Sequence, residues 1–248
     1  MTWLQRDVCL ANIVAAANGL AETLGIVRVI PATLTSAISR LKTGEIILER
    51  KRGIGIASNH PLSSALFAAF NKANLNPRLY NDSASMKWSK LVTNLICNAS
   101  SAILNLSPAE IIADKALFRL EMNQLKEAFQ VIKAQNIRLS DLPATPVRLL
   151  AFAVETLPLV ISQPILRRAV GAGRGSKMPS FHIDLYSGRG KSEVEFLNGA
   201  VVRFGERLGI PTPVNKLLTE TLNELTLGEL EINSFSKNPQ KFLSLLDE

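Results

Sequence analysis

The stretch 86-MKWSKLVTNLICNASSAIL-104 is the most informative part of the chain. Its apolar residues recur with the period of an amphipathic helix, and we predict a helix over residues 85–104. Three polar residues, Lys90, Asn94 and Asn98, follow at four-residue intervals, which would place them along one side of that helix. Asparagine costs a helix about 0.5 kcal/mol relative to alanine, so two asparagines in step with a lysine indicate a specific use.

Two interpretations of this polar side remain open. The first is the solvated face of an ordinary amphipathic helix. Such a face usually carries long charged side chains, whereas this one carries short amides, Thr93 and Cys97 with a single lysine. The second interpretation is the wall of a ligand cleft, where short donors and acceptors orient a bound molecule. In such a cleft Lys90 could act as a proton donor.

The chain upstream of residue 82 mixes strand and helix patterns. Short β-rich runs bounded by Gly, Pro and Asn predict strands at residues 12–19 and 26–35 and a β-hairpin over 45–57. A helical pattern follows at residues 61–74. This first region is therefore predicted to be α/β.

Downstream of residue 82 the pattern is helical. Ser107 and Glu110 have the spacing of a capping box, which predicts a helix start there. The ranges with helical periodicity are 85–104, 107–135, 144–170, 179–209 and 213–226. We therefore predict a small α/β region, residues 1–82, followed by a larger all-α domain, residues 83–248.

The composition narrows the choice of partners. A net charge of +7 would suit nucleic acid, an anionic membrane or a phosphorylated ligand. No nucleic-acid-binding module is recognisable, and 6% aromatic residues do not favour stacking on single strands. Two cysteines and two histidines predict neither a disulfide framework nor a metal site. Since no signal peptide or membrane-spanning run is recognisable, we expect a cytoplasmic protein that binds no metal, membrane or nucleic acid.

A second polar segment is 179-PSFHIDLYSGRGKSEVEFLNGAVVRFGERLGIPTPVN-215. It offers Ser180, Asp184 and Glu193. A carboxylate such as Glu193 could complement a lysine across a cleft. Charged helices of this kind are also common on ordinary solvated surfaces, so the residues alone leave both interpretations open.

Four pieces of the sequence together resemble the ketopantoate reductase (2-dehydropantoate 2-reductase) family. The first is Asn18-Gly19 after a predicted strand, and the second is the W-x-K-x3-N-x3-N run that begins at Trp88. The third is Ser180 with Asp184. The fourth is the S-E-V-E-x2-NG-x2-V-R run over residues 192–203, followed by G-I-P-T-P-x-N. The pieces occur in the family's order and cover nearly the whole chain from about residue 12.

The resemblance implies a fold and an activity. Members of the family reduce 2-dehydropantoate to pantoate with NADPH, a step of pantothenate and coenzyme A biosynthesis. They have an N-terminal Rossmann domain and a helical domain similar to the C-terminal domain of 6-phosphogluconate dehydrogenase. By this resemblance residues 1–82 would be the latter half of a Rossmann-like NADP-binding domain, and residues 83–248 the helical substrate and catalytic domain. A homodimer is a further expectation.

The resemblance also implies roles for individual residues. Lys90 would be the general acid that protonates the ketone oxygen as hydride arrives. Glu193 would be the second catalytic residue and would lie near cofactor and substrate. The implied substrate-binding residues are Asn18, Asn94, Asn98 and Ser180, and Asn18 would also contact the nicotinamide.

The sequence departs from the family at its beginning. The family opens with a strand and G-x-G-x-x-G, whose amides hold the pyrophosphate, and no such motif precedes residue 12. We therefore expect the chain to start inside the Rossmann domain and to lack the main phosphate cradle. Three alternatives follow: an inactive truncated reductase, a reductase of a different 2-oxo acid, and a non-catalytic helical remnant that dimerises or binds a partner.

Overall fold

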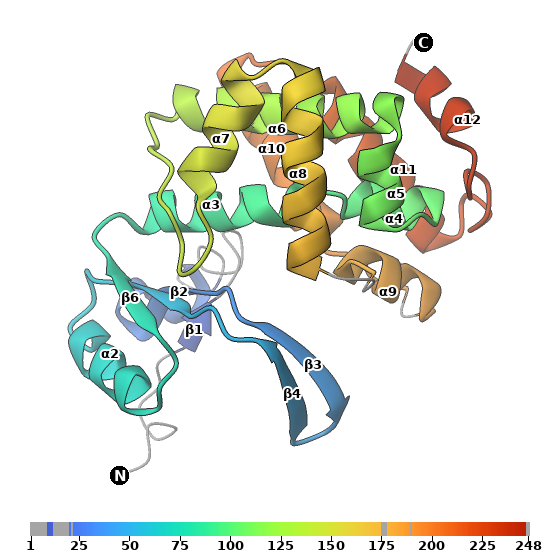
Figure 1. Cartoon of the computed structure of the whole chain (residues 1–248). Helices are drawn as coiled ribbons and strands as arrows, with labels where there is room; N and C mark the ends of the chain where they lie inside the picture. The colour runs from blue at the N-terminus through green and yellow to red at the C-terminus, as the bar shows by residue number, and fades with distance from the viewer. Residues whose placement is uncertain (1–8, 12–19, 21, 175–177, 189, 247–248) are drawn as a thin grey trace. The chain divides into compact units, whose positions relative to one another are not determined.

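The structure, a computed structural model, describes residues 9–11, 20, 22–174, 178–188 and 190–246. The contacts within it form two compact units. The first contains Met1–Thr93 and Ile137–Leu149, and the second contains Asn94–Asn136 and Leu150–Glu248. The chain passes from the first to the second within helix α3 (Ser83–Leu95), which Figure 1 labels. A domain boundary near residue 82 stays a prediction.

The first unit contains a four-stranded sheet. Its order is β1-β2-β5-β6, with β1 (Cys9–Ala11), β2 (Val29–Leu34), β5 (Ile54–Ala57) and β6 (Pro77–Tyr80). Strands β1 and β2 pair in parallel, as do β5 and β6, whereas β2 and β5 are antiparallel. A short 3-10 helix, η2 (Ile26–Arg28), leads into β2. The strand predicted at residues 12–19 lies outside the described residues.

Helix α2 (Ser63–Lys72) connects the parallel strands β5 and β6, as the crossover helices of α/β proteins do. Ser63 Oγ donates a 2.6 Å hydrogen bond to the carbonyl oxygen of Ala57, which ties the start of the helix to the end of β5. On β5, Gly55 allows a close approach, because a Cβ there would lie 2.8 Å from Met86 Sδ. Tight packing around β5 therefore stabilises this part of the unit.

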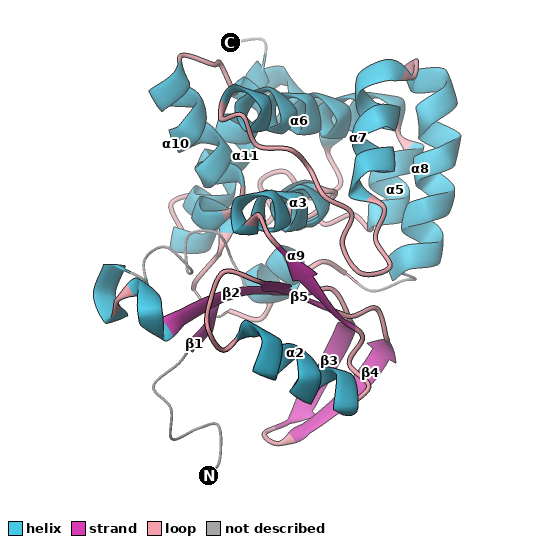
Figure 2. Cartoon of the chain, turned by 90° about the vertical axis from the view of Figure 1, so that its left-hand side faces the viewer, coloured by secondary structure: helices cyan, strands magenta, loops and turns pink. Residues whose placement is uncertain are grey.

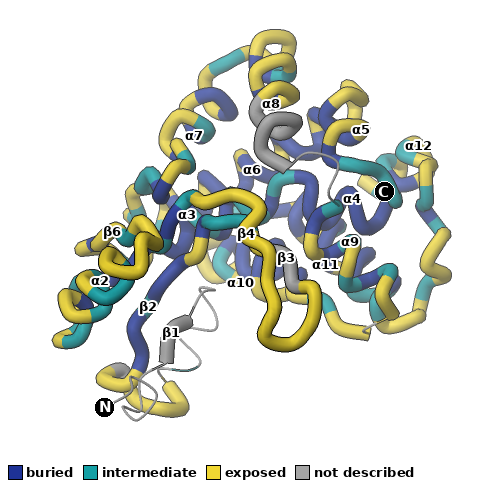
Figure 3. The backbone as a smooth tube through the Cα atoms, turned by 60° about the horizontal axis from the view of Figure 1, so that its bottom comes forward, coloured by how far each residue is buried: buried dark blue, intermediate teal, exposed yellow. Residues whose placement is uncertain are grey.

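A separate hairpin consists of β3 (Ala37–Lys42) and β4 (Glu45–Arg50), which pair antiparallel. The predicted hairpin over residues 45–57 is wrong, because β4 pairs with β3 and β5 pairs with β2. Gly44, at φ +82°, lies in the two-residue turn that closes the hairpin. Figure 3 shows β4 exposed along its whole length.

The rest of the described chain is mainly helical, as Figure 2 shows. The helices are α4 (Ala99–Leu104), α5 (Pro108–Ala113), α6 (Lys115–Ala134), α7 (Val147–Thr156), α8 (Leu159–Arg174), α9 (Ser180–Tyr186), α10 (Asn198–Leu208), α11 (Pro213–Leu227) and α12 (Pro239–Leu243), with 3-10 helices η3 (Val194–Phe196) and η4 (Ser244–Leu246). In the second unit, α6 packs against α5, α10 and α11. The prediction of a small partial sheet region followed by a larger helical region is confirmed.

Several of the long predicted helices are interrupted. The range 107–135 contains both α5 and α6, because Asp114 ends one helix and caps the next. Its Oδ1 accepts hydrogen bonds from the backbone N–H groups of Ala116 and Leu117, at 2.8 and 2.9 Å. The capping box of Ser107 and Glu110 is confirmed at the start of α5. None of the helices in the described ranges is long and apolar enough to cross a membrane.

Candidate active site

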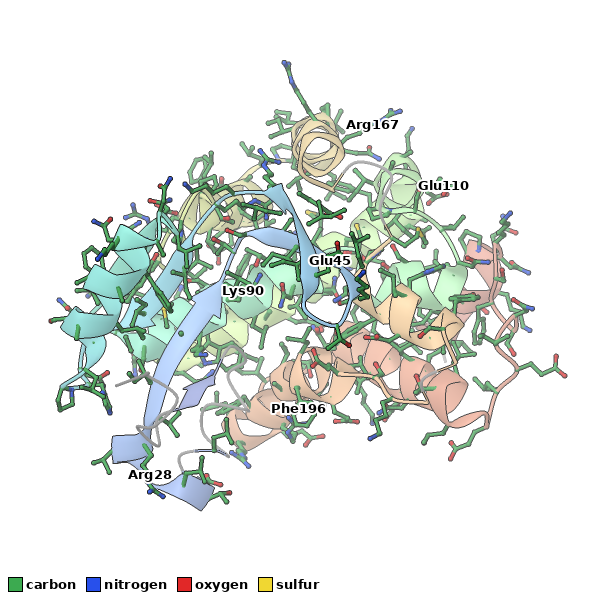
Figure 4. All side chains as sticks on the ribbon, turned by 90° about the horizontal axis from the view of Figure 1, so that it is seen from below. Arg28, Glu45, Lys90, Glu110, Arg167 and Phe196 are labelled. Carbon is green, nitrogen blue, oxygen red and sulfur yellow. The ribbon has the colours of Figure 1, made fainter. Side chains whose placement is uncertain are left out.

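Helix α3 carries two of the predicted site residues. Lys90 and Asn94 lie one turn apart on it and are both half-buried (Figure 4 labels Lys90). Thr93 Oγ1 donates a 2.8 Å hydrogen bond to the carbonyl oxygen of Lys90, the usual local bond of a helical threonine. The apolar side of α3 is fully buried at Leu91 and Leu95. The polar side of α3 is therefore neither fully solvated nor fully buried at these two residues.

The predicted helix over residues 85–104 is wrong in one respect that matters for the site. α3 ends at Leu95, and residues 96–98 form a turn before α4 begins. Within the turn Cys97 has φ +51°, in the left-handed region that residues with a Cβ avoid. Asn98 therefore does not continue the helical register of Lys90 and Asn94. Sequence periodicity missed the break because no Gly or Pro marks it.

The turn brings Asn98 together with Ser180, which lies 82 residues further along the chain. Asn98 Nδ2 donates to Ser180 Oγ at 3.3 Å, and Asn98 Oδ1 accepts from the backbone N–H of Phe181 at 3.1 Å. Asn98 is only 4% exposed, whereas Ser180 is exposed. The asparagine thus holds the first residues of α9, including the exposed Ser180.

Glu193 directly precedes η3 and lies within electrostatic range of Asp184, a residue of α9. Burial, followed by the negative charge of Asp184, raises the pKa of the Glu193 carboxyl. A carboxyl with a raised pKa can keep its proton at higher pH and donate a hydrogen bond. Ser180 and Asp184 lie one turn apart on α9, so these two residues of the second polar segment are neighbours on the same side of the helix.

Glu195, two residues further on, is hydrogen-bonded to side chains of α10 and α11. Its Oε2 accepts from Arg203 Nη1 at 3.0 Å, and its Oε1 accepts from Asn223 Nδ2 at 2.5 Å. A Cβ at Gly199 would lie 2.6 Å from Glu195 Oε2, so the glycine lets this carboxylate approach the helix closely. Part of the S-E-V-E-x2-NG-x2-V-R run is therefore explained by packing between η3, α10 and α11.

Lys87 is a titratable residue that the sequence reasoning missed. Its side chain is 4% exposed, and Nζ donates to the carbonyl oxygen of Ala32 on β2 at 2.5 Å. Burial lowers the pKa of the Lys87 amine to about 7. The signal was available, because Lys87 precedes the buried Leu91 by one helical turn and so belongs to the apolar side.

A buried network of polar side chains was missed as well. Asn198 Nδ2 donates to Gln124 Oε1 at 2.9 Å and to Asn215 Oδ1 at 3.1 Å. Glu127 accepts from the backbone N–H groups of Val214 and Asn215, both at 2.9 Å, and so caps the start of α11. Burial raises the pKa of the Glu127 carboxyl despite these hydrogen bonds. Such long-range networks leave no periodic signal in a sequence.

Asn18 lies outside the described residues, so its predicted contacts with substrate and nicotinamide stay predictions. Over the described ranges, no group of three or more His, Cys, Asp and Glu side chains could hold a metal ion.

Comparison with known families gives a match over the helical region. The family model described as "Ketopantoate reductase PanE/ApbA C terminal" matches residues 82–226, more than half of the 248-residue chain. Among curated proteins, a 2-dehydropantoate 2-reductase of Pyrobaculum aerophilum is 28% identical over 189 residues, which are 76% of this chain and 59% of that protein. The chain spans between 44% and 61% of the length of the curated relatives that it matches.

Solved structures share the fold. A ketopantoate reductase from Ralstonia eutropha JMP134 matches with a TM-score of 0.71 and 24% identity, over 88% of this chain and 66% of that chain. A D-mandelate dehydrogenase in complex with NADH matches with a TM-score of 0.69 and 16% identity, over 88% of this chain and 75% of that chain. At these identities the likeness concerns the fold alone.

Proposed function

This chain belongs to the ketopantoate reductase family, and on that premise we propose that it reduces 2-dehydropantoate to pantoate with NADPH as hydride donor. The observation that carries the proposal is the family match over residues 82–226, a range that includes Lys90, Glu193 and the Asn98–Ser180 pair. The reaction would be a step of pantothenate and coenzyme A biosynthesis. A cytoplasmic location and a homodimer stay predictions.

Lys90 would supply the proton in this reaction. As a ketone accepts hydride at its carbon, negative charge develops on its oxygen. An ammonium group close to that oxygen stabilises the charge and then transfers a proton to it, which yields the hydroxyl group of the product. The half-buried position of Lys90 on α3 supports this role, because a partly desolvated cation interacts more strongly with a developing anion than a solvated one does.

The other predicted residues would bind and orient the keto acid. Asn94 and the exposed Ser180 would donate hydrogen bonds to its oxygen atoms. Asn98 would contribute by holding Ser180, since both ends of its amide are already occupied by Ser180 and Phe181. Glu193, whose pKa is raised by burial and by the charge of Asp184, would lie near substrate and cofactor.

NADPH enters the proposal through the family. In Rossmann domains the dinucleotide pyrophosphate lies on a glycine-rich turn between a strand and a helix. The connection from β5 to α2, residues 58–62, contains no glycine and does not fit such a cradle. We therefore propose that the described residues bind the keto acid, and we assign none of them to the pyrophosphate of NADPH.

The experiment is an NADPH oxidation assay with 2-dehydropantoate, together with calorimetric titration of each ligand into the 248-residue chain. We expect Lys90→Ala to lower turnover by about 100-fold or more, the usual effect of removing a general acid. Lys126→Ala, which removes an exposed lysine of α6, is the matched control and should leave turnover unchanged. Turnover that survives in Lys90→Ala would exclude the proposed role of this lysine.

The same assay separates the alternatives. Activity on another member of a panel of 2-oxo acids, with none on 2-dehydropantoate, would identify a reductase of a different substrate. A well-folded sample that binds neither ligand would identify a non-catalytic protein that dimerises or binds a partner. Binding of the keto acid alone would mean that only the substrate half of the site works in this chain.

A further inference from the structure

A buried carboxylate lies directly behind the turn that carries Asn98. Glu121, on α6, is 0% exposed. Its Oε2 accepts a 2.7 Å hydrogen bond from the backbone N–H of Cys97, and its Oε1 accepts a 2.5 Å bond from Ser100 Oγ. Gln124 Nε2 donates to Oε2 at 2.9 Å. Three donors, from the turn, from α4 and from α6 itself, thus converge on one carboxylate.

The turn needs such a contact. Cys97 has φ +51°, and a residue with a Cβ adopts this conformation only when its surroundings hold it there. The bond from its own N–H to Glu121 acts at the strained residue itself. The bond from Ser100 fixes the first turn of α4, which follows immediately. Glu121 therefore holds both sides of the break between α3 and α4.

Asn98 transmits this geometry to α9. It follows Cys97 directly, and its amide pairs with Ser180 Oγ and with the backbone N–H of Phe181. A rotation of the turn at Cys97 would move the Asn98 side chain away from both partners. The position of the Ser180 hydroxyl consequently depends on a carboxylate that it does not touch.

We propose that Glu121 is a positioning residue, which acts through the left-handed turn at Cys97 and through Asn98 to hold Ser180 in place for substrate. The role in substrate binding rests on the proposed function. A carboxylate without solvent is costly to bury, and an apolar side chain would fill the same space without that cost. We attribute the presence of a carboxylate at residue 121 to the three hydrogen-bond donors that it holds in one arrangement.

The test compares three variants of Glu121 in the full chain. Glu121→Met keeps the volume and removes both acceptors, Glu121→Asp keeps the charge and shortens its reach, and Glu121→Gln keeps one acceptor at the same reach. The first readout is the pair of backbone amide resonances of Cys97 and Phe181 in nitrogen–proton correlation spectra. The second is the affinity for 2-dehydropantoate, measured by calorimetry.

We expect Glu121→Met and Glu121→Asp to shift both amide resonances and to weaken substrate binding by about tenfold, while Glu121→Gln restores both toward the wild type. Glu127→Gln is the matched control: it alters another buried carboxylate of α6, one that caps α11 instead. It should shift the resonances of Val214 and Asn215 and leave that of Phe181 in place.

Each outcome is decisive. Unchanged Cys97 and Phe181 resonances in Glu121→Met, or in Glu121→Asp if the methionine variant does not fold, would overturn the proposal. Shifts of the Cys97 and Phe181 resonances in Glu127→Gln that are as large as those in Glu121→Met would also overturn the proposal, because they would indicate general destabilisation. If the wild type binds no 2-dehydropantoate, the proposed function fails, yet the two resonances still decide whether Glu121 positions the turn.

Discussion

The amine of Lys87 donates a hydrogen bond to the carbonyl oxygen of Ala32, at 2.5 Å, from a side chain that is only 4% exposed. This bond joins α3 to β2 within the first unit. Because the site is buried, the neutral form of the amine is favoured in the folded state, and its pKa falls to about 7. In the unfolded chain the same amine has an ordinary pKa near 10.5.

Lys87→Met is therefore expected to stabilise the protein most at low pH. Between about pH 7 and 10.5 the unfolded chain binds more protons at this position than the folded protein does, so stability rises with pH in that window. Below pH 7 the full cost of charging the buried amine is present. We expect the methionine variant to gain roughly 2–4 kcal/mol at pH 6 and progressively less toward pH 10.

Urea denaturation at pH 6, 8 and 10 measures this effect. Lys126→Met, at an exposed position of α6, is the control and should show no such pH dependence. A stability difference for Lys87→Met that is constant across the three pH values would contradict burial of an ionisable amine at this position.

Asn98→Ala is expected to lower the free energy of unfolding by about 1–3 kcal/mol, because it leaves the buried N–H of Phe181 without its acceptor. Thermal or urea denaturation checks the loss. Asn123→Ala, on the exposed side of α6, should change stability by no more than about 0.5 kcal/mol and serves as the control. Equal effects of the two changes would mean that the Asn98 amide does not support α9.

Asp184→Asn is expected to lower the pKa of Glu193. The negative charge of Asp184 is one of the two causes that raise this pKa, after burial, and the substitution removes the charge while keeping the shape. A carbon-13 NMR titration of the Glu193 carboxyl measures the change directly. Glu206→Gln, which removes an exposed carboxylate of α10, should leave the Glu193 titration where it was. A Glu193 pKa that stays the same in Asp184→Asn would show that burial alone raises it.

Gly55→Ala is expected to destabilise the first unit by about 1–3 kcal/mol through overpacking. The new Cβ would lie 2.8 Å from Met86 Sδ and 3.0 Å from Thr33 Cγ2 and Tyr80 Cε2. Shortening the flexible neighbour should relieve the clash, so the double variant Gly55→Ala, Met86→Val should be more stable than the two single changes predict when added. Additive effects in urea denaturation would rule out this contact as the cause.

Local sequence patterns predicted those features of the fold that depend only on residues close together in the chain. The helical periodicity downstream of residue 82 identified the helical region, and the four-residue spacing of Ser107 and Glu110 identified a real capping box. Four short motifs taken together, among them the one that begins at Trp88, indicated the family that the match over residues 82–226 establishes. Each of these signals arises from residues within a few turns of one another, where backbone geometry repeats and sequence spacing translates directly into position.

Tertiary structure alone decided the contacts that shape the candidate site. The break at Cys97 is imposed from α6, since Glu121 holds a backbone conformation that the local residues do not favour. The pairing of Asn98 with Ser180 spans 82 residues, and that of Lys87 with Ala32 spans 55. The sequence by itself determined which segments are helical and which family they belong to. Packing determined where the helices break and which polar groups meet, because buried donors and acceptors must find partners wherever the fold brings them.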